Sequence, residues 1–408
     1  MLEFISDIVY DGEELNFPLF AFFTIVAVTL INKLFGDLNP LGRSIDLFKT
    51  FLVQETKRNI SVNEFIDEYN EMYSEDDNGR KEGAESRNAA YATLVNAYYE
   101  LVTLFYEWGW GQSFHFAYQT KDEPFRYAIA RHEYFLAGKL GVIADEKVLD
   151  VGCGIGGPMR NIAKFTKANV VGVTLNEYQV IRGNELNKSM GLLSNDVSSK
   201  YKGEGHSGSA ISIQANFMEL RKRFASNSFD GAYAIEATCH APKRQGVYSE
   251  IFRALKPGKI FSCYEWVLTE KYNAEDSHHR LIKKKIAEGD GLPDIISAEE
   301  VLDAMREVGF EIVEARDMAL DNLYGGDPWY WPLYPSWNPF DFRFQMNPFG
   351  KGVIQVVLTV LEFLRLAPKG SAKVQGMLQQ GAWGLAQGGK LGIFTPMYLV
   401  VARKPLDS

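Results

Sequence analysis

The sequence has few of the residues that build metal centres or disulfide frameworks. Its 408 residues include 3 cysteines and 6 histidines. Cys153, Cys239 and Cys263 show no ligand spacing and the histidines are scattered, so no metal site is predicted. An odd cysteine count without a disulfide framework fits a reducing compartment.

An excess of basic charge is also missing. The net charge is −9 and the isoelectric point is about 5.4, so the overall electrostatics do not indicate a nucleic-acid partner. The chain has no evident internal repeat. Because it is 46% hydrophobic and longer than a typical domain, it can bury a full core and carry additions around it.

Charged residues are absent from positions 15–32, and residues 17–31 are almost wholly apolar. With Leu34 and Phe35 assisting, this run reaches the lower end of the roughly 17 to 25 residues that cross a bilayer. Residues 1–36 are therefore expected to form a membrane anchor; the alternative is an apolar helix in the interface or on the protein's own surface. Acids precede the run and bases follow it, so the positive-inside rule predicts a cytosolic body. These flanking charges are Asp7, Asp11, Glu13, Glu14, Lys33, Arg43 and Lys49.

Residues 147–158 join an apolar strand, one acid and a turn made of glycines. A short aliphatic run that ends in glycines is typical of a buried parallel strand before a tight turn. Gly152, Gly154 and Gly157 let the backbone pass close to a ligand, and residues 161–165 continue as a helix whose N-terminus faces the same spot. The alternative is a plain strand-to-helix connection without a ligand.

Dinucleotide-binding domains share this Gly-x-Gly-x-x-Gly spacing, but they need an acid about 20 residues further on. Here the second predicted strand, 168–173, is followed by Thr174, Leu175 and Asn176, with no acid. S-adenosylmethionine sites instead often have an acid just before the glycines, and Asp150 fills that place. The motif therefore favours S-adenosylmethionine.

Strand and helix patterns alternate along the chain, which predicts an α/β fold with a doubly wound sheet and a ligand site at the carboxyl ends of its strands. Residues 37–86 read as a polar connector, 87–316 as the core, and 317–408 as a C-terminal region. Strands are predicted at 148–151, 168–173, 210–214, 229–235, 259–266, 310–316 and 396–401, and helices at 87–108, 123–140, 245–255, 298–308, 353–365 and 373–385.

Three further stretches suggest chemistry. In residues 106–116 aromatic rings crowd around one Glu and one His, an environment suited to a cation, or else an aromatic packing loop. Glu236 follows a predicted strand and so lies in the crevice, where burial raises a carboxyl pKa. Residues 327–349 are dense in Trp, Tyr and Phe, which indicates a lid or substrate wall, or alternatively a hydrophobic subdomain core or membrane contact.

With these motifs, residues 87–405 resemble the sterol 24-C-methyltransferases. The matching stretches occur in order along the chain, which is hard to produce by chance. They are Tyr-Glu-Trp-Gly-Trp-Gly-Gln-Ser-Phe-His-Phe at Tyr106, Ile-Ala-Arg-His-Glu at Ile129, Leu-Asp-Val-Gly-Cys-Gly-Ile-Gly-Gly-Pro at Leu149, Ile-Glu-Ala-Thr-Cys-His-Ala-Pro at Ile235, Gly-Asp-Gly-Leu-Pro at Gly289, and Phe-Thr-Pro-Met-Tyr-Leu-Val-Val-Ala-Arg-Lys-Pro at Phe394.

The resemblance implies a Rossmann-like, seven-stranded class I methyltransferase that transfers a methyl group from S-adenosylmethionine to the side-chain C24 double bond of a sterol. A carbocation, a hydride shift and loss of a proton would follow. Such chemistry needs water exclusion, aromatic faces near the cation and one base. The sterol could be of the cycloartenol, lanosterol, zymosterol or 24-methylene type. An endoplasmic reticulum membrane location is expected, and a homo-oligomer is left open.

The resemblance also nominates site residues. For catalysis, Glu236, Glu133 and His132 rank ahead of Glu107 and His115, either of which could hold the sterol hydroxyl; a cap, ion pair or packing role is the alternative for each. Tyr106 joins these candidates. Thr174 replaces the usual ribose-binding acid, as in cyclopropane fatty acid synthases. The expected cofactor contacts are Asp150, Gly152, Cys153, Gly154, Gly157, Thr174, Leu175, Gln179, Asn216, Phe217 and Glu236.

Two rivals remain at this point. One is methylation or cyclopropanation of another lipid alkene. The other is a non-catalytic sterol-binding membrane protein on a methyltransferase scaffold, since a fold does not fix a function.

Overall fold

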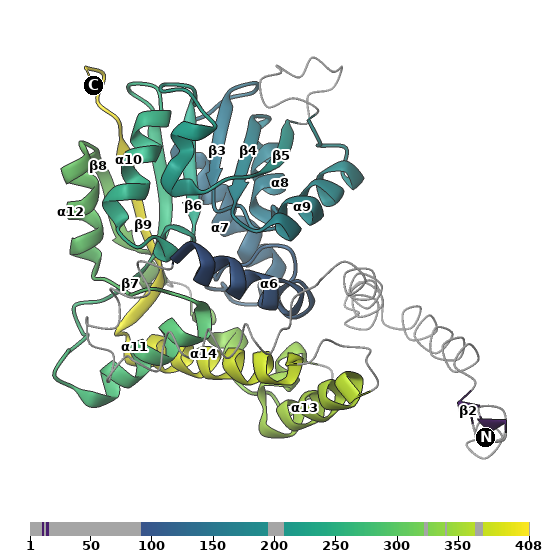
Figure 1. The fold of residues 1–408 in the computed structure, drawn as a ribbon. Coiled ribbons are helices and arrows are strands. Elements are labelled where there is room, and N and C mark those ends of the chain that lie inside the picture. Colours follow the sequence, from purple (N-terminus) through teal and green to yellow (C-terminus); the bar gives the residue numbers. More distant parts are fainter. Residues whose placement is uncertain are drawn as a thin grey trace. The chain divides into compact units, whose positions relative to one another are not determined.

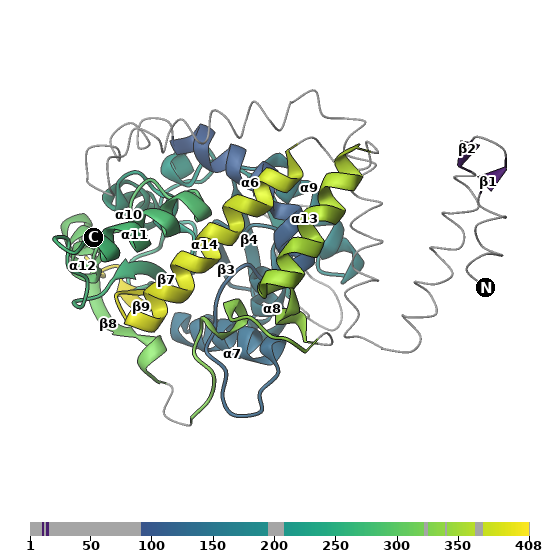
Figure 2. The ribbon, with the colours of Figure 1, turned by 90° about the horizontal axis from the view of Figure 1, so that it is seen from below.

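The computed structural model describes residues 10–11, 14–15, 91–194, 208–321, 325–338, 341–363 and 370–407. The chain divides into two compact units, Met1–Asn59 and Ile60–Ser408. In the first unit, the described residues form a short antiparallel ladder of β1 (Tyr10–Asp11) and β2 (Glu14–Leu15). The second unit holds the other described elements (Figures 1 and 2).

The prediction of a membrane anchor over residues 1–36 needs correction. In the part of the chain that the structure describes, no helix is long and apolar enough to cross a bilayer. Leu15, the first residue of the uncharged run, belongs to strand β2 and not to a helix. The apolar run at residues 17–31 lies outside the described residues. The single N-terminal span and the endoplasmic reticulum membrane location that accompanied it were therefore wrong.

The second unit is built on a seven-stranded mixed sheet, which confirms the α/β prediction. Its order is β5-β4-β3-β6-β7-β9-β8, and the neighbours from β5 to β7 pair in parallel. Strand β9 pairs antiparallel with both β7 and the edge strand β8. The strands are β3 (Lys147–Val151), β4 (Asn169–Thr174), β5 (Ser209–Gln214), β6 (Gly231–Ile235), β7 (Ile260–Leu268), β8 (Glu311–Asp317) and β9 (Phe394–Arg403).

The sheet is covered on both faces, which explains why its central strands are continuously apolar. Successive side chains of a strand point to opposite faces. Val148 of β3 belongs to the core that includes helices α7 (Phe125–Leu140) and α8 (Gly157–Thr166). Leu149 belongs to the opposite core, with α10 (Arg244–Ala254) and α12 (Ala298–Val308). The fold is therefore a three-layer α/β arrangement around two apolar cores.

A helical layer lies beyond the carboxyl ends of the parallel strands. Figure 1 shows α6 (Tyr91–Gly109) directly below the sheet, with α11 (Ser277–Asp290), α13 (Pro348–Phe363) and α14 (Ser371–Leu391) below it. Helix α14 packs against α11, α13 and α6. Because ligands bind at the carboxyl ends of such strands, this layer encloses the expected site.

No residue range was predicted for two helices, α9 (Glu177–Ser189) and α11. The buried residues of α9 are Gln179, Gly183 and Asn187, so its inner face carries no apolar periodicity to detect. Helix α11 follows an Asp276 cap but is largely basic and polar in sequence. The predicted helices at 245–255, 298–308, 353–365 and 373–385 correspond to α10, α12, α13 and α14.

Candidate active site

A cavity opens at the carboxyl ends of β3, β4 and β6, where α6 closes it from outside. It brings together several residues nominated from sequence: Gly152, Cys153, Gly154, Thr174, Leu175, Gln179, Phe217, Glu236 and His115. It also contains residues that the sequence did not single out, namely Val95, Asn96, Tyr99, Gln112, Phe114, Ile155, Pro158, Asn176, Ile235, Ala237 and His240.

The glycine turn forms one wall of this cavity. Gly152, Gly154 and Gly156 all have positive φ, at 85°, 52° and 77°, which only glycine adopts without strain. A Cβ built on Gly152 would lie 2.3 Å from the Cβ of Ala237, the residue after Glu236. Gly157 is needed for a different reason, because a Cβ there would lie 2.2 Å from the carbonyl oxygen of Gln112. The turn is therefore packed between the Glu236 segment and the aromatic segment 110–116.

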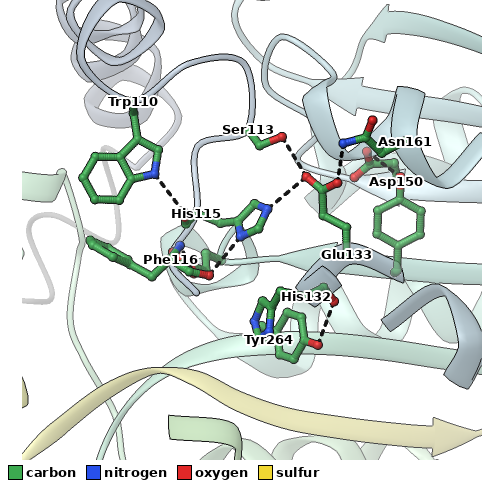
Figure 3. Close-up of polar contacts among 11 residues, drawn as sticks. Trp110, Ser113, His115, Phe116, His132, Glu133, Asp150, Asn161 and Tyr264 are labelled. Atoms are coloured by element: carbon green, nitrogen blue, oxygen red, sulfur yellow. Dashed lines mark hydrogen bonds and ion pairs between the residues drawn. The ribbon is translucent and has the colours of Figure 1, made fainter. Parts of the chain in front are cut away.

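Asp150 does not line the cavity but lies beneath the glycine turn. Its Oδ2 accepts a hydrogen bond of 2.8 Å from the Tyr233 hydroxyl (Figure 3). Burial raises the pKa of Asp150 to about 7, against the lowering effect of the Tyr233 bond. The carboxyl group thus ties β3 to β6 directly below the turn.

The turn after β4 is fixed by side-chain amides and a hydroxyl. Thr174 donates to Oε1 of Gln179 at 2.6 Å, and the Gln179 amide donates to the Thr103 hydroxyl of α6 at 3.1 Å. Asn176 caps α9 by accepting from the Gln179 backbone amide. Asn216 is likewise a helix cap, which accepts from Met218 N, and its neighbour Phe217 faces the cavity. This part of the cavity wall therefore contains uncharged polar side chains and the Phe217 ring. Neither position 174 nor position 216 carries a carboxylate.

Glu236 is the acid that the structure places in the cavity wall. It has a φ of 52°, a left-handed conformation that is uncommon for a side-chain-bearing residue and is found at functional sites. Its Oε1 accepts from Phe116 N at 2.7 Å and its Oε2 accepts from the Trp266 indole at 2.9 Å. Burial raises its pKa to about 8, while the charge of His115 and the two hydrogen bonds lower it. The carboxyl group is thus oriented by two donors that also surround it with aromatic rings.

The aromatic segment 110–116 folds over this acid. The Trp110 indole donates to the carbonyl oxygen of His115 at 2.8 Å, which closes the segment on itself (Figure 3). The ring of Phe116 lies 5.0 Å from those of Trp110 and Trp329 and 6.2 Å from that of Trp266. The segment therefore supplies a cluster of ring faces beside the carboxyl group of Glu236, whereas the sequence placed the rings of residues 106–116 around Glu107 and His115.

Glu133 anchors the same segment from below and does not line the cavity. Its Oε1 accepts from Ser113 at 2.7 Å and from Nε2 of His115 at 3.1 Å, and its Oε2 accepts from the Asn161 amide at 2.6 Å (Figure 3). Burial lowers the pKa of His115, but the bond to Glu133 and the charges of Glu133 and Glu236 outweigh it and leave the pKa raised. Glu133 thus joins α7, α8 and the aromatic segment.

We expect Glu133→Gln to lower the free energy of unfolding by about 1 to 3 kcal/mol, because one buried donor then faces an amide NH₂ instead of an acceptor. Urea unfolding measures this change. Glu185→Gln is the matched control, since Glu185 is 61% exposed and pairs with Arg182 at 3.5 Å. A surface pair of this kind contributes about 0 to 1 kcal/mol. Equal losses in the two variants would contradict the anchoring role.

Three other nominated residues lie outside the cavity wall. His132 is buried with its ring stacked 3.7 Å from that of Tyr264, and burial lowers its pKa well below the usual range. Glu107 forms a two-pronged ion pair with Arg182 of α9. Tyr106 hydrogen-bonds Tyr98 and lies 3.4 Å from Oδ1 of Asp290.

Sequence reasoning did not identify the residues that hold the Gly-Asp-Gly turn at the end of α11, which are His240 and Tyr99. Tyr99 donates to Nε2 of His240 at 2.9 Å when Nδ1 of His240 donates to the carbonyl oxygen of Gly291. Burial lowers the pKa of His240 to about 4 and raises that of Asp290 to about 8. Both residues lie in stretches quoted for the family resemblance, which was the available signal. Tyr106, the α6 partner of Asp290, was nominated from the sequence, but Tyr99, the α6 partner of His240, gave no signal because the two residues meet only in the folded chain.

The chain is similar to known methyltransferases over most of its length. The family model for the sterol methyltransferase C-terminal region matches residues 342–406, and that for a methyltransferase domain matches residues 149–263. A cycloartenol-C-24-methyltransferase 1 of Oryza sativa subsp. japonica is 45% identical over 85% of this chain and 94% of that protein. A sterol 24-C-methyltransferase of Saccharomyces cerevisiae is 41% identical over 86% of this chain and 88% of that protein.

Solved structures share the fold at low sequence identity. The cyclopropane synthase MmaA2 of Mycobacterium tuberculosis has a TM-score of 0.55 at 16% identity, covering 77% of this chain and 98% of that chain. A geranyl diphosphate methyltransferase solved with sinefungin has a TM-score of 0.53 at 16% identity, covering 77% of this chain and 99% of that chain. These similarities show the class I methyltransferase fold.

Proposed function

The chain belongs to the sterol 24-C-methyltransferase family, and from this premise we propose that it transfers a methyl group from S-adenosylmethionine to the side-chain C24 double bond of a sterol. The observation that carries the proposal is the position of Glu236. Its carboxyl group is held by two donors and surrounded by aromatic rings, in the wall of a cavity that the glycine turn also borders. The reaction develops positive charge on the sterol, and this arrangement suits such charge.

The cavity fits an S-adenosylmethionine-type cofactor. At Gly154 a Cβ would meet only a Phe114 ring carbon at 3.7 Å. At Gly152 the missing Cβ lets the Ala237 segment pack against the turn, and the N-terminus of α8 lies beside both glycines. Thr174, Leu175 and Gln179 would face the ribose, with Phe217 beside the adenine. The cofactor supplies an electrophilic methyl group when bound. Asp150 acts from beneath, because it positions the strand that carries the turn.

The residues of the chain supply orientation, water exclusion and charge. An alkene is a weak nucleophile, so alignment of its double bond and removal of water account for much of the barrier reduction. The rings of Phe116, Trp266 and Trp110 offer faces that stabilise a cation. We assign to Glu236 the negative charge that stabilises the sterol cation and accepts its proton. Glu133 and His115 act indirectly, by holding the aromatic segment.

Part of the C-terminal region would form the sterol wall. Trp329 contacts both Phe116 and Phe394, so the segment after β8 and strand β9 complete the ring cluster around Glu236. Within residues 317–408, it is therefore the Trp329 segment and β9 that would act with the core as one site.

The test of the function is incubation of the purified protein with labelled S-adenosylmethionine and a panel of cycloartenol-, lanosterol-, zymosterol- and 24-methylene-type sterols. We expect label in a methylated sterol side chain. Label in an unsaturated phospholipid and none in any sterol would instead indicate another lipid alkene. Sterol binding without label transfer would indicate a sterol-binding protein that lacks catalytic activity.

The raised pKa of Glu236 predicts a pH profile. The carboxylate is the active form, so activity is low below the pKa and rises as pH passes through about 8 in the free enzyme, where kcat/KM reports it. A positive charge bound beside Glu236 lowers its pKa, so the kcat profile should rise at lower pH than the kcat/KM profile. Initial rates from pH 6 to 9 measure both. A profile flat across this range would contradict a titrating carboxylate.

A further inference from the structure

Helix α13 exposes an apolar stripe on its outer side. Its inner side packs against η6 (Phe342–Met346) and α14. The outer side chains recur at intervals of three and four residues, which places them on one face of about 120°. The α13 stripe is defined by six side chains: Phe349 (62% exposed), Val353 (43%), Val356 (63%), Val357 (49%), Val360 (48%) and Phe363 (85%).

The charged side chains of Pro348–Phe363 lie away from the α13 stripe. Lys351 is half-buried on the opposite side, and burial lowers its pKa. Glu362 accepts a hydrogen bond of 2.6 Å from the backbone amide of Ala372 on α14. Gln355 and Thr359 are exposed and flank the stripe. A contiguous uncharged apolar face of this kind marks an interaction surface on a folded protein.

The stripe lies on the helical layer beyond the carboxyl ends of the parallel strands, the end of the sheet at which the cavity lies (Figure 1). Helices α13 and α14 run side by side in both views (Figures 1 and 2). Helix α14 crosses α11 at very close approach, since a Cβ on Gly289 would lie 2.2 Å from the Cα of Gly381. Gly289 precedes Asp290, which contacts Tyr106. The stripe is thus separated by one helix from residues that adjoin the cavity.

A lipid surface fits the α13 stripe better than a second copy of the chain does. A 16-residue helix is about 24 Å long and about 10 Å wide, so one face offers roughly 240 Å². A stable protein interface buries about 800 Å² on each partner. An interfacial helix needs no complementary partner, because its apolar face sinks about 5 to 10 Å into the lipid. At 16 residues α13 lies in the surface and does not span it.

We propose that α13 docks the protein on a lipid surface, with the α13 stripe inserted among the acyl chains, so that the sterol enters from the lipid phase. This inference rests on the proposed function, because a sterol substrate dissolves in lipid and not in water. Since the stripe carries no charge, docking should occur on neutral lipid and should not weaken with salt.

The experiment is flotation of the full chain with phosphatidylcholine vesicles at low and high salt. The test variant is Val356→Glu/Val360→Glu, which places two charges in the stripe. The matched control is Gln355→Glu/Thr359→Glu, which places two charges at the same spacing on the exposed flank of the same helix. We expect the test variant to partition at least about tenfold less than wild type, because the apolar burial is lost, and the control to stay close to wild type.

Methyl transfer provides the second readout. With sterol delivered in vesicles, the rate of the test variant should fall in parallel with its binding, whereas with sterol delivered by cyclodextrin it should match wild type. Equal flotation of test variant and control would overturn the proposal. So would a wild-type dimer that dissociates in the test variant with unchanged flotation, since that result assigns the stripe to contact between copies. If wild type methylates no sterol from cyclodextrin, the proposed function fails, while flotation still decides the docking.

Discussion

We expect Gly152→Val to weaken S-adenosylmethionine binding on the order of a thousandfold, or about 4 kcal/mol. Gly152 has a φ of 85°, where a β-branched residue is strained by about 1 to 3 kcal/mol. Its Cβ would also lie 2.3 Å from the Cβ of Ala237, so the strand end that carries Glu236 must move. The displacement closes space that the cofactor would occupy. Titration calorimetry measures the loss.

The control for this substitution is Gly141→Val. Gly141 ends α7 with a φ of 64°, and nothing lies within 4 Å of a Cβ built there. This variant therefore carries the backbone strain without the overlap at the cavity, and its cofactor affinity should stay near that of wild type. Unchanged binding in Gly152→Val would remove the glycine turn from the cofactor site. A loss of the same size in both variants would attribute the effect to folding.

The central strands of the sheet were predictable because they are buried on both faces. Continuous aliphatic runs such as residues 148–151 and 168–173 have no helical alternative of that length, and β3 and β4 lie within a residue or two of them. The direction of β9 was not readable from its sequence. An apolar strand shows the same composition whether its hydrogen bonds run parallel or antiparallel, so its antiparallel pairing with β7 depends on the route of the whole chain.

The cavity was predictable where the backbone itself forms it. Gly152 and Gly154 need positive φ at a strand end, and Glu236 follows the neighbouring strand of the sheet. Because ligands bind at the carboxyl ends of parallel strands, these residues are expected at the same site. His132 shows the limit of this reasoning. It stands one residue before Glu133 on α7, yet its ring stacks on Tyr264 beneath the aromatic segment. The direction of the His132 side chain depends on how α7 packs against the sheet, which the sequence does not show.

The part of the site contributed by α6 was not predictable. Val95, Asn96 and Tyr99 reach the cavity because α6 lies across the ends of the strands, and no local pattern encodes that crossing. Asp290 was quoted within a family motif but not nominated, since its relation to Tyr106 joins residues far apart in the chain. Side-chain roles that depend on such long-range contacts need the structure.

We expect Glu236→Gln to retain cofactor and sterol binding but to lose turnover by about a hundredfold to a thousandfold, or about 2.7 to 4 kcal/mol. The amide keeps the size of the side chain, and its oxygen can still accept from Phe116 N or from the Trp266 indole. The negative charge is lost. Because that charge acts on a cation present only along the reaction path, the loss falls on kcat and much less on binding.

A sterol analogue with an ammonium at the cationic carbon separates charge stabilisation from structural damage. It should bind tightly to wild type and more weakly to Glu236→Gln, because the carboxylate is complementary to positive charge at that position. The neutral sterol should bind both proteins alike. Glu107→Gln is the control, since Glu107 is also an acid beside the aromatic segment but pairs with Arg182 outside the cavity wall. Turnover by Glu236→Gln near that of wild type would move the catalytic charge to another group, and Asp290, which adjoins Tyr106, would be the next acid to substitute.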